Sequence, residues 1–308
     1  MLHQCLQTIA AQSRQVAEVL IVHCGDDQET ERTANDPVWQ HAGLVCRYFR
    51  HPVRNAAAQR NFAAARTTCE VLLLLDDDVE LAPDWCAELV APIERDATVG
   101  ATMGALTNQR LEPPSWYWRL YRQMAGGARA LEPGRLAGAA LPNGFPDGAT
   151  TAIAAEWLGG GIAAIRRTAF ESVGGFAPYF DGSSPGEDLD LGLRLSHHWR
   201  VLFVPAAHAV HHSASGGRSP SAEYQYQSIR SRFAILMHAR GLSRAGALGQ
   251  VLLWMAFQFV SEVGALLRGR GHGFGAVWSG RVRGLRSCLR WQPAAPQHRA
   301  VLFPGATP

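Results

Sequence analysis

The sequence predicts an α/β fold: a Rossmann-like, mixed but mainly parallel sheet flanked by helices, with a C-terminal helical appendage. Three observations predict it. Short apolar segments of strand length alternate with segments in which apolar residues recur at helical spacing. The 308 residues are 47% hydrophobic and 18% charged, which is ordinary for a chain that folds around a large core. Residues 240–308 are basic, with nine arginines against one acidic residue, Glu262.

Residues 1–94 alternate between helix and strand. A helix is expected at the start, because Leu2, Leu6 and Ile9 recur at helical spacing. The segment "VLLLLDDD" (71–78) is expected to begin as a continuous apolar strand of the kind that parallel sheets bury. The other elements expected here are strands at 19–22 and 44–49 and helices at 55–67 and 83–94.

The later part of the chain is less regular at first. Residues 107–155 are rich in Pro, Gly and Arg, and one helix is expected there, at 116–124. The elements expected after it are an ordered segment at 157–176, a helix at 186–199, a strand plus loop at 200–213, and helices at 221–240 and 247–267. We therefore divide the chain into a domain of residues 1–220 and a helical, basic region of residues 221–308.

Three consecutive aspartates, Asp76, Asp77 and Asp78, follow the apolar strand directly. In open α/β sheets, ligands collect outside the carboxyl ends of the strands, so these side chains are expected to line a binding crevice. Carboxylate oxygens presented together suit Mg²⁺ or Mn²⁺, which in turn binds phosphate oxygens. The structural alternative is a solvated acidic turn or a helix cap.

A second acidic cluster, "GEDLDLGLR", places Glu187, Asp188 and Asp190 at the start of a predicted helix. Acidic residues at that position can simply complement the helix dipole. Together with the aspartate triplet they permit a second role, in which one carboxylate accepts a proton from an incoming nucleophile.

Histidine is the third element. The segment "HAVHH" places His208, His211 and His212 after a strand and a proline turn. One neutral imidazole there could reach a metal ion, although histidines in loops usually face solvent.

Taken in order, "EVLIV", "LLLLDDD", "GGGIAAIRRTAF", "GEDLDLGLRL" and "VPAAHAVHH" resemble family 2 glycosyltransferases of the GT-A fold, in particular bacterial rhamnosyltransferases. The resemblance covers about residues 1–213. It implies a nucleotide-sugar donor that is bound through a divalent cation, Mg²⁺ or Mn²⁺. It also implies transfer to a hydroxyl of a glycan or a lipid-linked acceptor in one displacement, which inverts the anomeric configuration.

The resemblance also implies roles for individual residues. Asp188, beside Glu187, would be the general base. Asp78 would be a metal ligand together with Asp76 and His211. The residues that would contact the donor or line its pocket are Asp76, Asp77, His23, Asn55, Arg60, Gly160 and Gly161.

Two departures from the family pattern stand at the N-terminal end. The family normally opens with a strand that helps to hold the nucleobase, whereas this sequence opens with the helix that follows it. Either the true start lies upstream or the protein lacks this first strand, and we expect an upstream in-frame start to supply it. In addition, His23 stands where the family usually has an aspartate near the base or ribose.

Two other function classes use the same acidic residues. One is a Mg²⁺-dependent nucleotidyl- or phosphotransferase, although the sequence has no P-loop motif and no lysine. The other is a non-catalytic scaffold with a GT-A-like fold. Binding of nucleoside diphosphates with Mn²⁺ separates a transferase from such a scaffold.

The basic C-terminal region predicts an anionic partner surface. Residues 247–267 are long enough to span a bilayer, but Gln258, Ser261 and Glu262 interrupt them on one side. This leaves a broad apolar face with Trp254, Phe257 and Phe259 around it. We expect an amphipathic helix that lies on a membrane through residues 240–290, with a helix packed on the domain and a true span as alternatives. Scattered cysteines and the absence of a signal peptide at Met1 predict the cytoplasm, at the inner face of the cell membrane. No nucleic-acid partner is expected.

Overall fold

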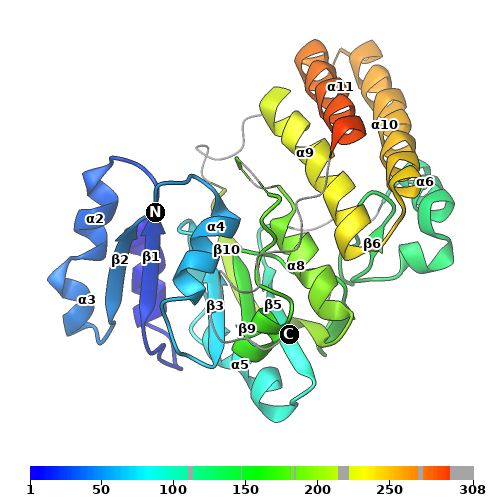
Figure 1. Cartoon of the computed structure of the whole chain (residues 1–308). Coiled ribbons are helices and arrows are strands. Elements are labelled where there is room, and N and C mark those ends of the chain that lie inside the picture. The colour runs from blue at the N-terminus through cyan, green and yellow to red at the C-terminus, as the bar shows by residue number, and fades with distance from the viewer. Residues whose placement is uncertain are drawn as a thin grey trace.

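The structure is a computed structural model that describes residues 1–109, 114–146, 148–180, 182–183, 185–213, 222–269 and 273–291. Its centre is a six-stranded sheet of order β3-β9-β5-β10-β4, with β8 paired to β10 (Figure 1). The strands of this sheet are β3 (Val71–Leu75), β4 (Val79–Leu81), β5 (Val99–Leu106), β8 (Ile153–Ala155), β9 (Ile162–Arg166) and β10 (Arg200–His211). Two smaller sheets pair β1 (Val19–His23) with β2 (Cys46–Arg50) and β6 (Leu136–Ala137) with β7 (Leu141–Pro142).

Strands β3, β5 and β10 share one direction. Strand β9 is antiparallel to both β3 and β5, so β3 and β5 point the same way, and β10 is parallel to β5. Strands β1 and β2 are also parallel to each other. The expected α/β class, with a mixed and mainly parallel sheet, is confirmed.

Strand β3 is apolar on both faces because both faces are covered. Leu72 and Leu74 pack with Phe170 on one side of the sheet, whereas Leu73 and Leu75 pack on the other. The expectation of parallel pairing at β3 was wrong for the residues that the structure describes, since its partner there is the antiparallel β9. The reason is tertiary: β9 returns between β3 and β5.

Strand β10 is longer than the sequence predicted. It continues to His211, so His208 and His211 lie on a strand and not in a loop. The proline that was read as the end of the strand, Pro205, falls in a shift of register between Phe203 and His208. Proline is tolerated in strands at such irregularities.

Helices cover both faces of the sheet. Helices α1 and α5 pack on one face, and α4, α7 and α8 pack on the other. Helices α2 and α3 lie beside the β1–β2 pair (Figure 1). The bounds of these helices are α1 (Leu2–Ala10), α2 (Gln28–Ala34), α3 (Pro37–His41), α4 (Ala56–Ala64), α5 (Trp85–Arg95), α7 (Arg167–Ser172) and α8 (Glu187–Ser196). All six cysteines lie in described residues and are free.

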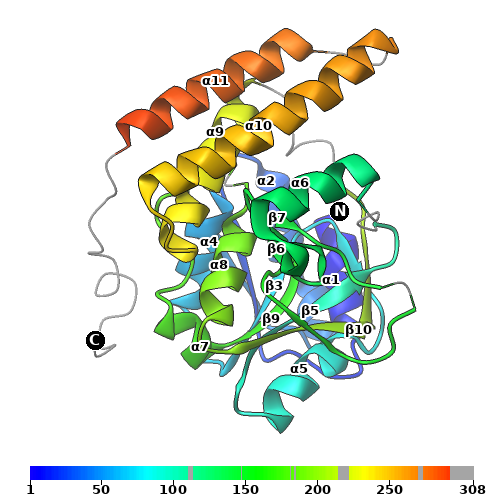
Figure 2. The ribbon, with the colours of Figure 1, turned by 90° about the vertical axis from the view of Figure 1, so that its right-hand side faces the viewer.

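A second helical layer lies across one end of the molecule (Figure 2). Its core contains Tyr121, Phe233 and Val251, which come from three different helices. The elements of this layer are α6 (Trp116–Gly126), the 3₁₀ turn η1 (Ala128–Leu131), α9 (Ala222–Ala234) with its π-helical continuation η2 (Ile235–Ala239), α10 (Arg244–Leu267) and α11 (Phe274–Arg290). The sequence predicted two helices after residue 220, and the structure has a third, α11. By length and composition alone, α10 could cross a membrane.

Candidate active site

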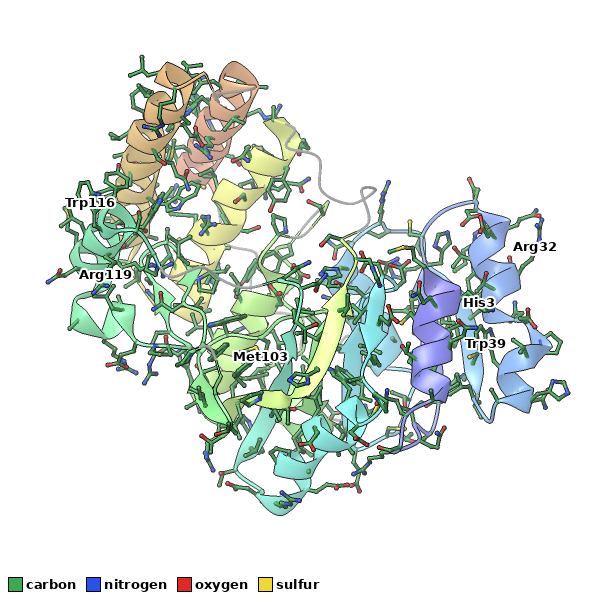
Figure 3. All side chains as sticks on the ribbon, turned by 180° about the vertical axis from the view of Figure 1, so that it is seen from behind. His3, Arg32, Trp39, Met103, Trp116 and Arg119 are labelled. Atoms are coloured by element: carbon green, nitrogen blue, oxygen red, sulfur yellow. The ribbon has the colours of Figure 1, made fainter. Side chains whose placement is uncertain are left out.

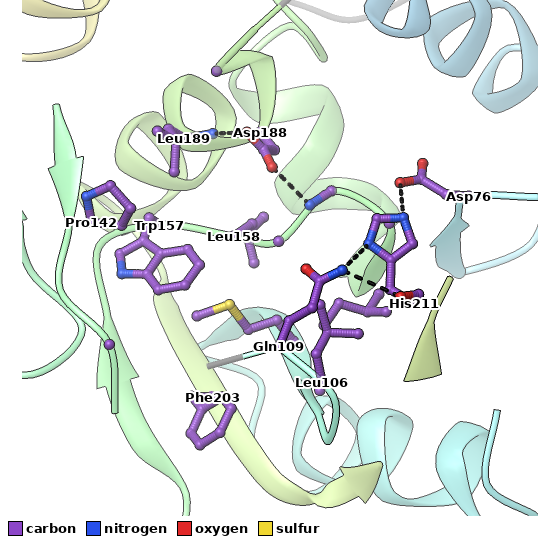
Figure 4. Close-up of a pocket in the computed structure, with 18 of the residues that line it drawn as sticks. Asp76, Leu106, Gln109, Pro142, Trp157, Leu158, Asp188, Leu189, Phe203 and His211 are labelled. Carbon is purple, nitrogen blue, oxygen red and sulfur yellow. Dashed lines mark hydrogen bonds and ion pairs between the residues drawn. The ribbon is translucent and has the colours of Figure 1, made fainter. Parts of the chain in front are cut away.

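A cavity of about 920 Å³ opens where β3 and β10 end (Figure 4). Its wall includes Asp76 after β3, His211 at the end of β10 and Asp188 in the first turn of α8. A cavity of this size can hold a cofactor or a nucleotide. The structure therefore brings together residues that lie more than a hundred positions apart in the sequence.

Asp76, Asp78 and His211 form a cluster whose possible ligand atoms all lie within 4.8 Å of one another. The His211 Nε2 lies 2.9 Å from an Asp78 oxygen and 3.8 Å from an Asp76 oxygen. The cluster arises from strand pairing, because β10 is antiparallel to β4 with His211 opposite Val79. That register sets His211 beside the residue before Val79, which is Asp78.

The donor set of this cluster fits a divalent cation. Two carboxylates and one imidazole converge, and the side chains of Asp78 and His211 are only 11% and 12% exposed. Near Asp78, local desolvation and then repulsion by Asp78 and Asp76 raise the pKa of Asp77. A bound cation would relieve this repulsion. Gln109 lies within 3.3 Å of the His211 Nδ1 and orients the ring.

Arg60 connects the cluster of Asp76, Asp78 and His211 to the start of α8. Its guanidinium donates to Asp76 at 2.7 Å and to Glu187 at 2.9 Å, and it lies over the ring of Phe176. The carboxyl groups of Asp76, Glu187 and Asp188 all lie close enough to act on this one cation. The site thus holds more negative than positive charge in a largely buried place.

Glu187 shows the effect of this imbalance. Burial and then the negative charge of Asp188 raise the pKa of Glu187 from 4.5 to about 8, although Arg60 opposes the change. A buried carboxyl group retains its proton when nearby positive charge does not offset its burial and its negative neighbours.

This pKa leads to a prediction about stability. The folded state retains a proton on Glu187 that the unfolded chain releases near pH 4.5, so raising the pH from 4.5 towards 8 should destabilise the metal-free protein. Glu187→Gln removes this contribution. Between pH 4.5 and 8 the free energy of unfolding of this variant should therefore decline by about 1–3 kcal/mol less than that of the native protein. Urea unfolding of both proteins across the range measures the difference, and parallel curves would contradict it.

Asp188 is oriented by the backbone. One oxygen accepts the N–H of Gly160 at 3.0 Å, and the other accepts the N–H of Leu189 at 2.8 Å (Figure 4). Burial raises the pKa of Asp188, whereas the Gly160 hydrogen bond and Arg60 lower it. The third residue of the acidic cluster has a different role. Asp190 is fully buried and binds Tyr179 and Arg194, so it holds the fold together.

Gly160 and Gly161 keep the two carboxylates close. A Cβ atom at Gly160 would lie 2.9 Å from the Asp188 Cβ, and one at Gly161 would lie 2.4 Å from an Asp76 oxygen. Both distances are too short for a real side chain. The two adjacent glycines therefore let Asp188 and Asp76 approach the same stretch of backbone.

Three of the predicted donor-site residues do not line the cavity: His23, Asn55 and Asp77. Asn55 is 5% exposed and uses its amide to cap α4 and to bind the carbonyl of Phe180. His23 ends β1, and its buried Nε2 has no hydrogen-bond partner among the described residues.

Several cavity residues had no signal in the sequence. Arg232 and Tyr224 reach the cavity from α9, in the region that was assigned to the C-terminal appendage. Phe145 stacks on Phe203 with ring centres 3.9 Å apart and lies next to Trp157. Aromatic residues from three separate segments are not recognisable as one wall until the chain is folded.

The family model of glycosyl transferase family 2 matches residues 1–174, which is more than half of the chain. The chain belongs to glycosyl transferase family 2. The matched part of this family 2 chain includes β3, the three aspartates and the glycine pair. Asp188 and His211 lie beyond it, so their place beside the cavity comes from the structure.

Two curated relatives are similar to this family 2 chain. The O-antigen biosynthesis protein RfbC of Myxococcus xanthus is 30% identical over 237 residues, which is 73% of this chain and 17% of that protein. The N-acetylglucosaminyl-diphospho-decaprenol L-rhamnosyltransferase of Mycobacterium tuberculosis is 45% identical over 69 residues, which is 21% of this chain and 22% of that protein. The match thus spans only 17% to 22% of the length of these relatives.

Solved structures show the fold. TarS 1–349 of S. aureus in complex with UDP has a TM-score of 0.54 at 14% identity, over 98% of this chain and 79% of that chain. The mannosyltransferase PcManGT of Pyrobaculum calidifontis, with GDP-Man and Mn²⁺, has a TM-score of 0.52 at 16% identity, over 94% and 82%. GalNAc-T7 with UDP, GalNAc and Mn²⁺ has a TM-score of 0.53 at 20% identity, over 71% and 41%. This family 2 chain has the GT-A fold that the sequence predicted.

Proposed function

We propose that this chain is a metal-dependent, inverting glycosyltransferase that moves a hexosyl group from a nucleoside-diphosphate donor to a hydroxyl of a glycan or lipid-linked acceptor. One observation carries the proposal. The adjacent glycines Gly160 and Gly161 set Asp188 and Asp76 against one stretch of backbone at a single cavity, and His211 and Asp78 complete the cation cluster beside it. A proton acceptor and a site for a charged leaving group thus share one wall.

Asp76, Asp78 and His211 would hold Mg²⁺ or Mn²⁺. When bound, such an ion stabilises the charge of a departing nucleoside diphosphate. Arg60 keeps Asp76 in position through its 2.7 Å hydrogen bond. Asn55 contributes indirectly, since it caps the helix that carries Arg60.

Asp188 is the general base of the proposed reaction. It accepts the proton of the acceptor hydroxyl, and the acceptor oxygen forms a bond to the anomeric carbon of the donor. The bond from that carbon to the phosphate oxygen breaks at the same time, and a single displacement inverts the anomeric configuration. The Gly160 N–H holds the carboxylate of Asp188 in one orientation for this transfer.

The two ligands would occupy different sides of the cavity. We assign the nucleotide to the side of Asp76 and Arg60, which line the cavity next to the cation cluster. We assign the acceptor to the aromatic wall of Phe145, Trp157 and Phe203, whose apolar surface suits the apolar face of a sugar ring. Residues 1–220 would supply the chemistry, and the name of the rhamnosyltransferase relative supports a lipid-linked acceptor. We place the reaction at the inner face of the cell membrane.

Nucleotide binding and transfer test the proposal. We expect UDP, GDP or dTDP, each with Mn²⁺, to raise the unfolding temperature of the protein, and a screen of nucleotide sugars to identify one that is consumed only with an acceptor. No response to any nucleoside diphosphate would favour the scaffold alternative. Consumption of nucleoside triphosphates in place of nucleotide sugars would favour a nucleotidyl- or phosphotransferase.

A prediction concerns the glycine pair. In Gly161→Ala the new Cβ would lie 2.4 Å from an Asp76 oxygen, so the carboxylate has to move. Displacing one ligand should weaken Mn²⁺ binding by about 10- to 100-fold. Calorimetric titration with Mn²⁺ measures this. Gly159→Ala is the matched control, because its Cβ would meet Ile162 at an ordinary 3.4 Å, and equal affinities of the two variants would be evidence against the cluster as a metal site.

A further inference from the structure

The outward side of α10 is apolar along its whole length. For a helix of a water-soluble domain the solvent-facing side is normally polar. Here the described side chains that face outward between residues 245 and 267 carry no polar atom, and several are large: Leu252 is 50% exposed, Val260 59% and Leu267 83%. The large exposed side chains of this side, the outer face of α10, are Leu252, Phe259, Val260, Leu266 and Leu267.

Two polar residues of α10, Gln250 and Glu262, bind neighbouring helices. Gln250 donates to the carbonyl of Ala125 in α6. Glu262 accepts a hydrogen bond from the indole of Trp278 and pairs with the buried Arg281, both of α11. The outer side of α10 is therefore suited to an apolar medium, and its inner side to polar contacts with the neighbouring helices.

Helix α6 extends the same surface. It lies against α10, because the Tyr117 hydroxyl donates to the carbonyl of Phe257 and the two rings are 4.7 Å apart. One turn apart along its outer side stand Trp116 (76% exposed), Leu120 (46%) and Met124 (60%). Figure 3 shows Trp116 and Arg119 extending from α6 at the edge of the molecule.

The charge around this surface identifies its occupant. Arg119 of α6 and Arg268 at the end of α10 are exposed, as are Arg286 and Arg290 of α11. Arginines beside an apolar helix face are attracted to anionic headgroups while the apolar side chains enter the boundary with the acyl chains. A second copy of the chain fits less well, because pairing this face with itself would bring two basic surfaces together. A bilayer span fits less well too, since Gln250 and Glu262 bind neighbouring helices.

We propose that the outer faces of α6 and α10 together form a docking surface that lies flat on an anionic phospholipid bilayer. The geometry connects this surface to the cavity. Arg232 lines the cavity and lies 4.5 Å over the ring of Trp254, which is on the inner side of α10. Two helices, α9 and α10, thus lie between the cavity and the lipid. The value of this arrangement for catalysis depends on the proposed function, because it would keep the cavity near a lipid-linked acceptor.

Vesicle flotation of the full chain tests the docking surface without any sugar donor. We expect binding to vesicles of phosphatidylcholine with phosphatidylglycerol, and weaker binding to vesicles of phosphatidylcholine alone. Leu252→Glu combined with Val260→Glu, and separately Trp116→Glu combined with Leu120→Glu, should each weaken binding about tenfold or more, since each pair removes apolar area from the lipid. Val38→Glu is the matched control: it places the same change at an exposed valine of α3 and should bind as the native protein does.

Four results would overturn the inference. The first is vesicle binding that neither double variant weakens, and the second is equal weakening of binding by Val38→Glu. The third is resistance of the bound protein to an alkaline carbonate wash, which marks a spanning helix. The fourth is a dimer in solution that Leu252→Glu dissociates, with no binding of the protein to vesicles. Unfolding temperatures of all variants show that they are folded. Nucleotide binding is measured separately on the same proteins, so failure of the docking surface and failure of the proposed function are distinguishable.

Discussion

Asp78→Ala should lower the rate of sugar transfer by about 10³-fold or more, because a cation at the leaving group contributes several kcal/mol to transition-state stabilisation. The variant removes the carboxylate that lies 2.9 Å from His211 Nε2 and leaves two of the three ligand side chains. The fold should persist, since β3 and β4 on either side are held by their apolar contacts. Initial rates at saturating Mn²⁺, together with the unfolding temperature, measure both expectations.

The control for this experiment lies two residues away. Glu80 is also acidic, but it pairs with His212 on a partly exposed side of β4 and does not belong to the cluster. Glu80→Gln should therefore retain the native rate within a small factor. If Asp78→Ala transferred sugar as fast as Glu80→Gln, the assignment of the metal site would have to be abandoned.

Asp188→Asn should lower kcat by about 10²- to 10⁴-fold, the usual contribution of a positioned general base. Asparagine can still accept the Gly160 N–H through its side-chain oxygen and loses only the hydrogen bond from the Leu189 N–H, so the protein should remain folded. Binding of the nucleoside diphosphate with Mn²⁺ should change little, because Asp188 is not one of the three ligand residues. Single-turnover rates and calorimetric affinities separate the two quantities.

Asp190→Asn should lower the stability of the fold and leave kcat near the native value. The buried Asp190 pairs with Arg194 and binds Tyr179, so its neutralisation leaves a largely buried cation without a charged partner. The cost should be about 3–5 kcal/mol of unfolding free energy. Its kcat, measured on the folded protein at low temperature, should stay near the native value. A rate for Asp188→Asn as high as that for Asp190→Asn would remove Asp188 as the base.

Much of the fold was predictable because local patterns and tertiary structure agree. The leucines of "VLLLLDDD" form β3, and both faces of that strand are buried, as a continuous apolar run requires. The helix at 116–124 and the helix with Glu187 and Asp188 in its first turn were also predicted, and both form. The errors concern partners and ends: the antiparallel pairing of β3, the extension of β10 through Pro205, and the third helix after residue 220.

The side of α10 that faces outward shows a different limit. The sequence predicted an amphipathic helix, with Trp254, Phe257 and Phe259 around its apolar face. In the structure only Phe259 of these belongs to the outer face, since Trp254 is buried under Arg232 and Arg281 and Phe257 packs on α6. Periodicity shows that a helix has two sides, but it does not show which side contacts the protein.

The sequence by itself determined the chemistry that is available: carboxylates directly after an apolar strand, an acidic pair at a helix start, two adjacent glycines and an arginine-rich end. Only the tertiary structure decided which of these residues act together. The β4–β10 register places His211 beside Asp78, and Arg60 bridges Asp76 to Glu187. Gln250 and Glu262 of α10 bind neighbouring helices. The physical reason is that these contacts depend on strand pairing and helix packing between distant segments, whereas sequence periodicity reports only what a segment buries locally.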